Sequence, residues 1–117
     1  MSTEAFVYKI LSVAEWAAAQ KAGIYRGSAD DARDGFIHFS TAAQVEETAA
    51  KYFSGQDDLL LISVDGGRLG GALKWEPSRG GALFPHFYGE LALSAVTKVE
   101  PLTLLPGGGH AFPPLAP

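Results

Sequence analysis

The chain has 117 residues, 47% of them hydrophobic and 19% charged, which is the composition of a single globular domain and excludes a disordered chain. Nine Lys and Arg against 13 Asp and Glu give a formal charge of -4, which argues against a nucleic-acid partner because such proteins present a basic face to phosphates. The chain contains no cysteine, so disulfides, thiolate nucleophiles and cysteine-based metal sites are excluded.

Hydropathy gives an expectation about location. The longest aliphatic run, residues 59–62, is far too short to cross a bilayer. The first residues lack the basic start and apolar core of a secretory signal. We therefore expect a cytoplasmic protein without membrane attachment.

A strand and a helix are the first elements expected along the chain. Residues 6–10 are rich in β-branched and aromatic side chains and predict a strand. Ser12 and Glu15 have the spacing of a capping box, which predicts a helix that begins at Val13. Gly23 is a suitable residue to end that helix.

A second strand and helix follow a polar segment. Residues 28–35 are polar and rich in turn-forming residues, and we expect a loop there. Residues 36–40 predict a strand that places His38 and Ser40 on one face. Thr41 starts a second capping box with Gln44, which predicts a helix to about Phe53.

The second half of the chain predicts strands only. Residues 59–64 read as a buried strand, 72–76 as an alternating strand and 93–105 as one or two strands interrupted at Pro101. We expect the aromatic segment 83–89 to be irregular. A single domain, 1–117, is predicted, with its core at about 6–105 and a loose C-terminal tail at 106–117. The fold class is α+β, with a split, twisted, mixed or antiparallel sheet of about six strands and two main helices.

Polar side chains that could carry chemistry lie in two segments. His38 and Ser40 share one face of a strand that is otherwise apolar, which is typical either of a half-buried structural histidine or of a pocket that binds a polar ligand. His86, Tyr88 and Glu90 alternate and would project to one face if extended, either to stack on a planar ring or as part of an aromatic plug.

Other familiar kinds of site find little support. Three scattered histidines, at 38, 86 and 110, lack the paired spacing of metal ligands, and we predict no metal site. Arg26, next to a glycine, could contact an anion. Asp30 and Asp31 are interpreted as loop and capping acids.

Four segments together resemble a known family: YKILSVAEWAAAQKAG, DGFIHFSTAAQ, RLGGALKWE and LFPHFYGEL. Over residues 6–105 the chain is similar to the bacterial and plant proteins grouped as domain of unknown function 952. The resemblance implies a fold like that of the ADP-ribosyltransferase superfamily, close to its RNA 2′-phosphotransferase branch. In that superfamily a strand with a histidine, a hydrophobic residue and a serine precedes a helix, which His38, Phe39 and Ser40 match.

The resemblance also implies a ligand, NAD or another ADP-ribose derivative, and a cleft between the strands of Lys9 and His38. Lys9 stands where relatives usually have the histidine that reads the ribose of NAD. The implied ligand-binding residues are Lys9, Arg26, His38, Ser40 and Tyr88. The catalytic candidates are His38, His86 and Glu90, although neither Glu90 nor Glu76 matches the expected catalytic acid well.

Three functions remain open from the sequence. The first is a nucleotide-binding protein with ADP-ribosyltransferase-like chemistry at the bond between nicotinamide and ribose. The second is a non-catalytic module that binds another small polar molecule in the same cleft. The third is an interaction protein with a degenerate site, whose contact patch is the aromatic segment 84–88.

Overall fold

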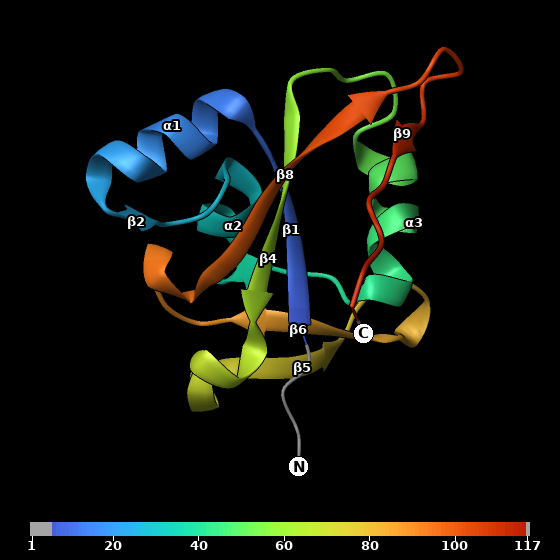
Figure 1. Cartoon of the computed structure of the whole chain (residues 1–117). Coiled ribbons are helices and arrows are strands. Elements are labelled where there is room, and N and C mark those ends of the chain that lie inside the picture. Colours follow the sequence, from blue (N-terminus) through green and yellow to red (C-terminus); the bar gives the residue numbers. More distant parts are fainter. Residues whose placement is uncertain (1–5, 117) are drawn as a thin grey trace.

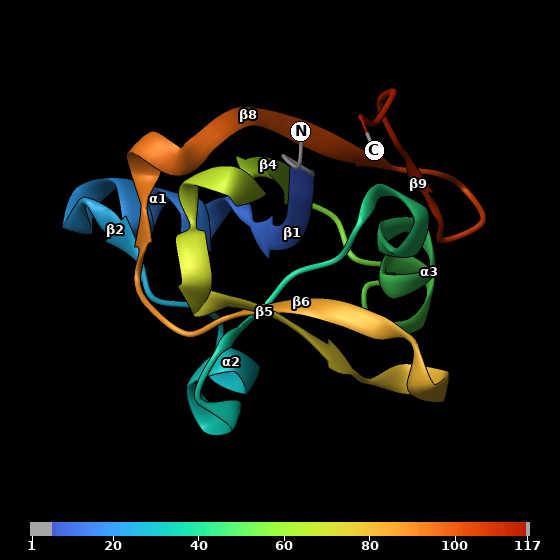
Figure 2. The same cartoon turned by 90° about the horizontal axis from the view of Figure 1, so that it is seen from below.

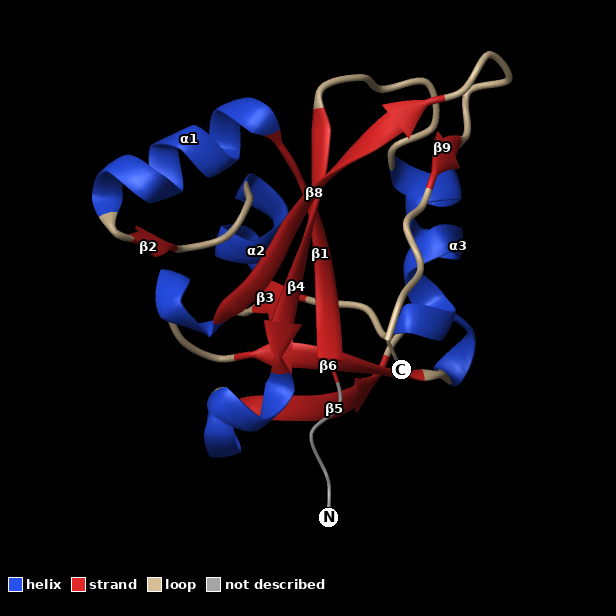
Figure 3. Ribbon diagram, viewed as in Figure 1, coloured by secondary structure: helices blue, strands red, loops and turns tan. Residues whose placement is uncertain are grey.

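The structure, a computed structural model, describes residues 6–116 and folds them into nine strands and three α-helices (Figures 1 and 3). The helices are α1 (Val13–Ala22), α2 (Ala29–Asp34) and α3 (Ala42–Tyr52). The strands are β1 (Phe6–Ser12), β2 (Ile24–Tyr25), β3 (Ile37–His38), β4 (Leu59–Asp65), β5 (Leu73–Pro77), β6 (Leu83–Phe87), β7 (Leu91–Ala92), β8 (Val96–Leu104) and β9 (His110–Ala111).

The strands form separate antiparallel sheets. The larger sheet has the order β1-β4-β8-β9, a second has β3-β6-β5, and β2 pairs with β7. Figure 2 shows β1, β4 and β8 on one side of the molecule and β5 and β6 on the other. The α+β class and the antiparallel sheets are confirmed, but about six strands was an underestimate, and a short third helix, α2, is present beside the two main helices. The additional elements have only two to six residues, too few to show a periodic pattern.

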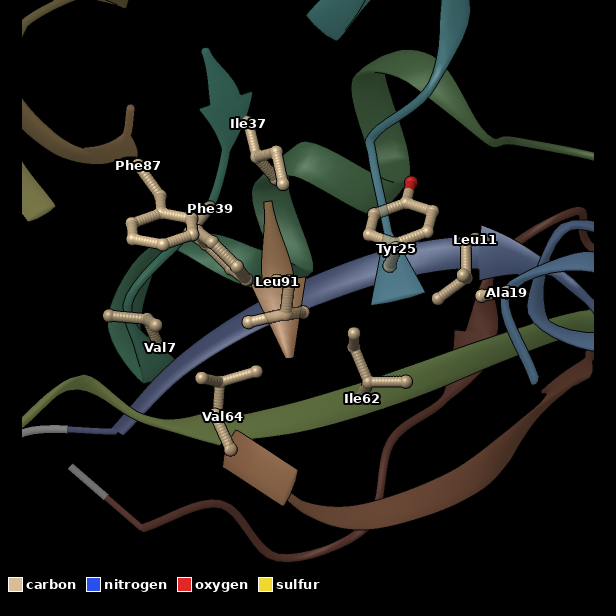
Figure 4. Packing of buried hydrophobic residues seen from close by; sticks show 11 residues of the cluster. Val7, Leu11, Ala19, Tyr25, Ile37, Phe39, Ile62, Val64, Phe87 and Leu91 are labelled. Atoms are coloured by element: carbon tan, nitrogen blue, oxygen red, sulfur yellow. The ribbon is translucent and has the colours of Figure 1, made fainter. Parts of the chain in front are cut away.

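Both faces of β1 are buried, so this strand of the larger sheet lies inside the molecule. Val7 and Leu11 belong to one apolar cluster with Ile62 and Val64 of β4 (Figure 4). Tyr8 and Ile10 point to the opposite face of β1 and belong to a second apolar cluster, beneath α3. Burying each such side chain contributes roughly 1.5–3 kcal/mol. The charged residue between them, Lys9, is also buried and must therefore find a partner inside the protein.

Helices α1 and α3 begin where the capping boxes predict. Ser12 Oγ accepts a hydrogen bond from the Glu15 amide at 3.0 Å, and the Ser12 amide donates one to Glu15 Oε1 at 2.9 Å. Gln44 accepts a bond from the Thr41 amide at 3.0 Å at the start of α3. These local pairings satisfy amides that the first helical turn leaves free. The two helices flank β1 on opposite sides (Figure 1).

The expected loop at residues 28–35 is wrong, because this segment contains α2. Ser28 and Asp31 form a capping box in which aspartate takes the place of the usual glutamate. The strand expected over 36–40 is shorter, since only Ile37–His38 pair with β6. Ser40 instead forms an isolated bridge with Tyr8, through amide-to-carbonyl bonds of 2.8 and 2.9 Å.

Two further expectations for the second half of the chain are wrong. The aromatic segment 83–89 is not irregular, because β6 is the central strand of its sheet and its residues 84–87 are buried. Strand β8 continues through Pro101. Its neighbour β9 pairs only with Thr103 and Leu104, so Pro101 lies where the outer side of β8 has no partner strand, which proline tolerates.

The C-terminal tail is not loose up to residue 116. It turns back at Gly108, whose carbonyl accepts a bond from the Gly55 amide at 2.8 Å, and then forms β9. Phe112 and Leu115 pack against the second cluster, and the Tyr8 hydroxyl donates to the Ala116 carbonyl. The apolar residues between the glycines and prolines supply this packing, so composition alone was misleading.

Candidate functional site

A pocket of about 290 Å³ lies between the two main sheets, beside α2 and α3. It is where the resemblance places a cleft, between the strand of Lys9 and the strand of His38. Its polar lining includes Lys9, Asp31, Asp34, His38, Ser40 and His86. Four of the residues singled out from the sequence, Lys9, His38, Ser40 and His86, thus line one pocket. The carboxylates of Asp31 and Asp34 line it with them.

Asp31 is the centre of the polar network beneath the pocket. Its side chain is 1% exposed. Its oxygens lie 2.9 and 3.1 Å from Lys9 Nζ and 2.6 Å from His38 Nδ1. They also accept bonds from the backbone amides of Ser28 and His38. One carboxylate thereby ties β1, α2 and β3 together.

The ionised form of Asp31 is strongly favoured. Burial by itself raises the pKa of this carboxyl, but the hydrogen bond from His38 and the charge and hydrogen bond of Lys9 outweigh burial. The net result is a pKa well below the ordinary value of 3.8. Removing one partner of such a buried pair typically costs about 3–5 kcal/mol.

Gly27 makes room for this carboxylate. Its backbone has φ of 104°, a conformation that favours glycine, and a Cβ atom there would lie 2.6 Å from Cβ of Asp31. The turn from β2 to α2 therefore passes directly over the Asp31 side chain. A residue larger than glycine at position 27 would force that side chain to shift.

His38 is held by carboxylates on both ring nitrogens. Nδ1 faces Asp31 at 2.6 Å, and Nε2 lies 3.0 Å from Oδ2 of Asp34. A neutral imidazole donates only one hydrogen bond, so both contacts are satisfied together only when both nitrogens carry protons. The side chain is 35% exposed, and the ring lies against Phe36 with centroids 4.5 Å apart.

His86 forms a second carboxylate–imidazole pair on the neighbouring strand. Its Nδ1 lies 2.8 Å from Oε1 of Glu76, and the Tyr88 hydroxyl donates to the same oxygen at 2.8 Å. These bonds, chiefly the one from His86, lower the pKa of Glu76, and the bond to Glu76 raises that of Tyr88. The His86 ring stacks on Phe36 with centroids 4.2 Å apart.

Ser40 is buried, and its hydroxyl lies 3.0 Å from Oγ1 of Thr48 on α3. Thr48 in turn donates to the Gln44 carbonyl at 3.2 Å. The Ser40 hydroxyl thus helps fix α3 to the segment that follows β3.

Arg26 and Glu90 lie outside the pocket. They pair with each other at 2.9 Å on the surface, where both side chains are more than half exposed. Arg26 instead lines a smaller hollow beside α1 and Tyr25. Tyr88 does not line the pocket either. Its hydroxyl donates to Glu76, and its ring lies against Phe36 with centroids 5.1 Å apart.

The expected contact patch at residues 84–88 is wrong for most of its length. Phe84 and Phe87 are 5% and 7% exposed, and only Tyr88 presents a large surface. The alternation of β6 buries its side chains on both faces, because one face meets the core and the other meets Phe36 and Glu76.

Sequence reasoning assigned no site role to Asp31, Asp34 or Glu76. A signal for Asp31 existed: Lys9 lies in an apolar strand, and a buried lysine requires an acid. Glu76 carried no comparable signal, because only the pairing of β5 with β6 brings it beside His86.

Among residues 6–116, no cluster of three or more His, Asp or Glu side chains is arranged to hold a metal ion. His110 lies in β9, where Nε2 is 2.8 Å from the Gln56 carbonyl oxygen. None of the described helices is long and apolar enough to cross a membrane.

Fold and site together define a class of protein: an α+β chain with split antiparallel sheets that enclose a polar pocket lined by paired imidazoles and carboxylates. Residues 10–99 match the family described as protein of unknown function DUF952, and the chain belongs to that family. No curated protein matches the chain.

Three solved structures of one bacterial protein, CC0527 from Caulobacter crescentus, are similar to the chain. The X-ray structure has 52% sequence identity and a TM-score of 0.88 and covers 91% of this chain and 93% of CC0527. An X-ray structure of a double mutant has 51% identity and the same TM-score. The solution NMR structure has 53% identity and a TM-score of 0.81, with 89% and 90% covered.

Proposed function

We propose that the chain has an ADP-ribosyltransferase-like fold and that the pocket around His38 binds a small ligand of the nucleotide class, NAD or another ADP-ribose derivative. The observation that carries the proposal is the convergence of Lys9, His38, Ser40 and His86 on one pocket from three separate segments of the chain. Convergent polar groups in a concave site fix the orientation of a small-molecule ligand.

The pocket suits the ribosyl part of such a ligand. Carboxylate oxygens of Asp34 and the imidazole of His86 are partners for sugar hydroxyls, and Phe84 offers an apolar wall. At about 290 Å³ the pocket lies at the lower end of the usual range of roughly 300–1,000 Å³, so it would take a nucleoside-sized part of a dinucleotide.

The pocket also contains acids that a glycosyl-transfer reaction needs. Cleavage of the bond between nicotinamide and ribose develops positive charge on the sugar, which a nearby carboxylate stabilises. Glu90 is too far from the pocket to serve, whereas Asp34 lines it with its side chain 33% exposed. In an enzymatic form of this function, Asp34 would balance that charge while His38 holds the carboxylate in place.

Isothermal titration calorimetry with NAD, ADP-ribose and a 2′-phosphorylated RNA end tests the proposal. We expect heat from at least one ligand and at least a tenfold loss of affinity in His38→Ala, since that variant removes the group that holds both Asp31 and Asp34. His110→Ala, which removes an imidazole outside the pocket, is the control. The absence of heat from all three ligands at millimolar concentration would reject the proposal.

A non-catalytic binding module is the second candidate, favoured by the pairing of charges in the pocket. Lys9 is occupied by Asp31, and both nitrogens of His38 face carboxylates, so neither group is placed to transfer a proton without losing a partner. This candidate predicts ligand binding that His38→Ala abolishes and no release of nicotinamide from NAD. Nicotinamide released by the wild type and lost in His38→Ala would favour the enzyme instead.

A further inference from the structure

We propose that the ligand-binding imidazole of the pocket is His86 and that Glu76 sets its Nε2 atom as an acceptor for a hydroxyl or N–H group of a neutral or cationic ligand. The inference rests on the proposed function, because it assumes that the pocket binds a ligand. It assigns the contact to a different histidine from the one that the sequence favoured.

The two imidazoles of the pocket differ in which nitrogens are free. His38 and His86 face each other across paired strands, with ring centroids 5.4 Å apart. His38 has a carboxylate on each nitrogen. His86 has one on Nδ1 only, and among residues 6–116 the structure gives its Nε2 no hydrogen-bond partner. His86 is therefore the imidazole that can bond a ligand without giving up a protein contact.

Glu76 determines the tautomer. An ionised glutamate can only accept a hydrogen bond, so His86 Nδ1 carries the proton and donates this hydrogen bond to Glu76 Oε1. The lone pair of the neutral ring is then on Nε2. The Tyr88 hydroxyl donates to the same Oε1 and so favours the ionised form of Glu76. Glu76 does not line the pocket, and it is therefore a positioning residue that acts through His86.

The ring is also fixed in orientation. His86 lies on the central strand β6, opposite Lys74 of β5, and Glu76 is two residues further along β5, at the diagonal position. Phe36 stacks on the ring with an interplanar angle of 27°. Because two strands and the Phe36 ring already hold the His86 imidazole in place, it loses little conformational entropy when a ligand binds.

The charge of the lining defines the ligand class. Among the lining residues whose side chains the structure describes, the two permanent cations, Lys9 and Arg33, are both paired with carboxylates. Asp30, Asp31 and Asp34 line the same pocket. Hydrogen-bond acceptors are thus available in the pocket, and its cations are already neutralised by carboxylates. This charge pattern places the phosphates of a dinucleotide outside the pocket and favours the entry of a nucleoside part with hydroxyl or amino donors. A neutral or pyridinium nucleoside has this chemistry.

The tautomer is measurable without a ligand, by long-range ¹H–¹⁵N correlation spectra of the imidazoles at pH 7. We expect His86 to show protonated Nδ1 and unprotonated Nε2 in the wild type. Glu76→Gln should shift His86 toward a mixture of tautomers, while Tyr88→Phe should keep the Nδ1–H form. A wild-type His86 with protonated Nε2, or an unchanged tautomer in Glu76→Gln, would overturn the positioning role.

Calorimetry with adenosine, nicotinamide riboside and ADP-ribose tests the ligand class. We expect at least one of the two nucleosides to bind at least tenfold more tightly than ADP-ribose, and His86→Gln to weaken that binding about tenfold, the loss of one hydrogen bond. Thermal unfolding checks that the variant folds, and Glu76→Gln, at a partly exposed position, provides a second variant that should weaken binding similarly.

The possible failures are distinguishable. Tightest binding of ADP-ribose, or wild-type affinity in His86→Gln together with its loss in His38→Ala, would overturn this inference and leave the proposed function intact. No binding of any nucleoside or nucleotide would reject the proposed function, and the inference with it.

Discussion

A single carboxylate, Asp31, shows how one residue serves both local and long-range structure. It closes the capping box of α2 and also neutralises a lysine buried in β1. The two roles are compatible because a carboxylate has several acceptor positions, and here they are shared among Lys9, His38 and two backbone amides.

The acid stability of the protein should reflect this residue. The pKa of Asp31 is lower in the folded state than its ordinary 3.8, so the unfolded state binds more protons between the two values. The stabilisation by ionised Asp31 is therefore complete above the ordinary pKa and decreases as the pH falls from about 4 toward the folded pKa. Urea unfolding between pH 2 and about 7 should show this decrease.

Asp31→Asn provides the comparison. It should lower the free energy of unfolding at pH 7 by about 3–5 kcal/mol, because it leaves the charge of Lys9 buried without a partner. It should also flatten the dependence on pH below about 4. Asp57→Asn, at an exposed loop position, is the control and should leave the profile nearly unchanged. An equally steep acid profile in Asp31→Asn would contradict this account.

At the scale of elements, the turn between β2 and α2 is constrained by the side chain that it covers. Gly23 and Gly27 both have positive φ, of 86° and 104°. A Cβ atom at Gly23 would meet nothing within 4 Å, whereas one at Gly27 would meet Asp31. A comparison of alanine at these two glycines therefore distinguishes the effect of backbone strain from that of steric overlap with Asp31.

Alanine at the two glycines should have different effects. Gly23→Ala should cost only the strain of a left-handed alanine, roughly 1 kcal/mol. Gly27→Ala should cost about 1–3 kcal/mol more, because the added methyl group displaces Asp31. Chemical denaturation of both variants measures the difference. Equal losses of stability would show that Asp31 yields easily to the methyl group.

For the molecule as a whole, the C-terminal segment belongs to the cooperative fold. It first forms β9 at the edge of the larger sheet and then runs along α3 (Figure 1), and its apolar residues complete the second cluster. Phe112→Ala should therefore lower the free energy of unfolding by about 2 kcal/mol, with a single unfolding transition. Leu105→Ala, at a position 43% exposed, is the control and should cost less. A Phe112→Ala variant as stable as wild type would mean that the tail contributes no packing.

Local chemistry was sufficient to predict α1 and α3 from the sequence, because Ser12 and Thr41 cap the helices that directly follow them. It also predicted β4, whose residues are apolar and β-branched over enough length to show a pattern. It missed α2, since a polar segment that contains Asp31 can form a loop as well as a short helix. The buried position of Lys9 was readable only in part, because the sequence shows that this lysine is in a strand but not which acid faces it.

The sequence by itself thus determined the class of fold, the main helices and the histidines that merit attention. Tertiary structure alone decided that Asp31, Asp34 and Glu76 join His38 and His86, and that Arg26 and Glu90 pair elsewhere. The physical reason is the sequence distance over which each interaction acts. Helix caps and hydrophobic alternation depend on residues a few positions apart. The partners of a buried charge come from strands far apart in the sequence, and their positions are fixed only when those strands pair.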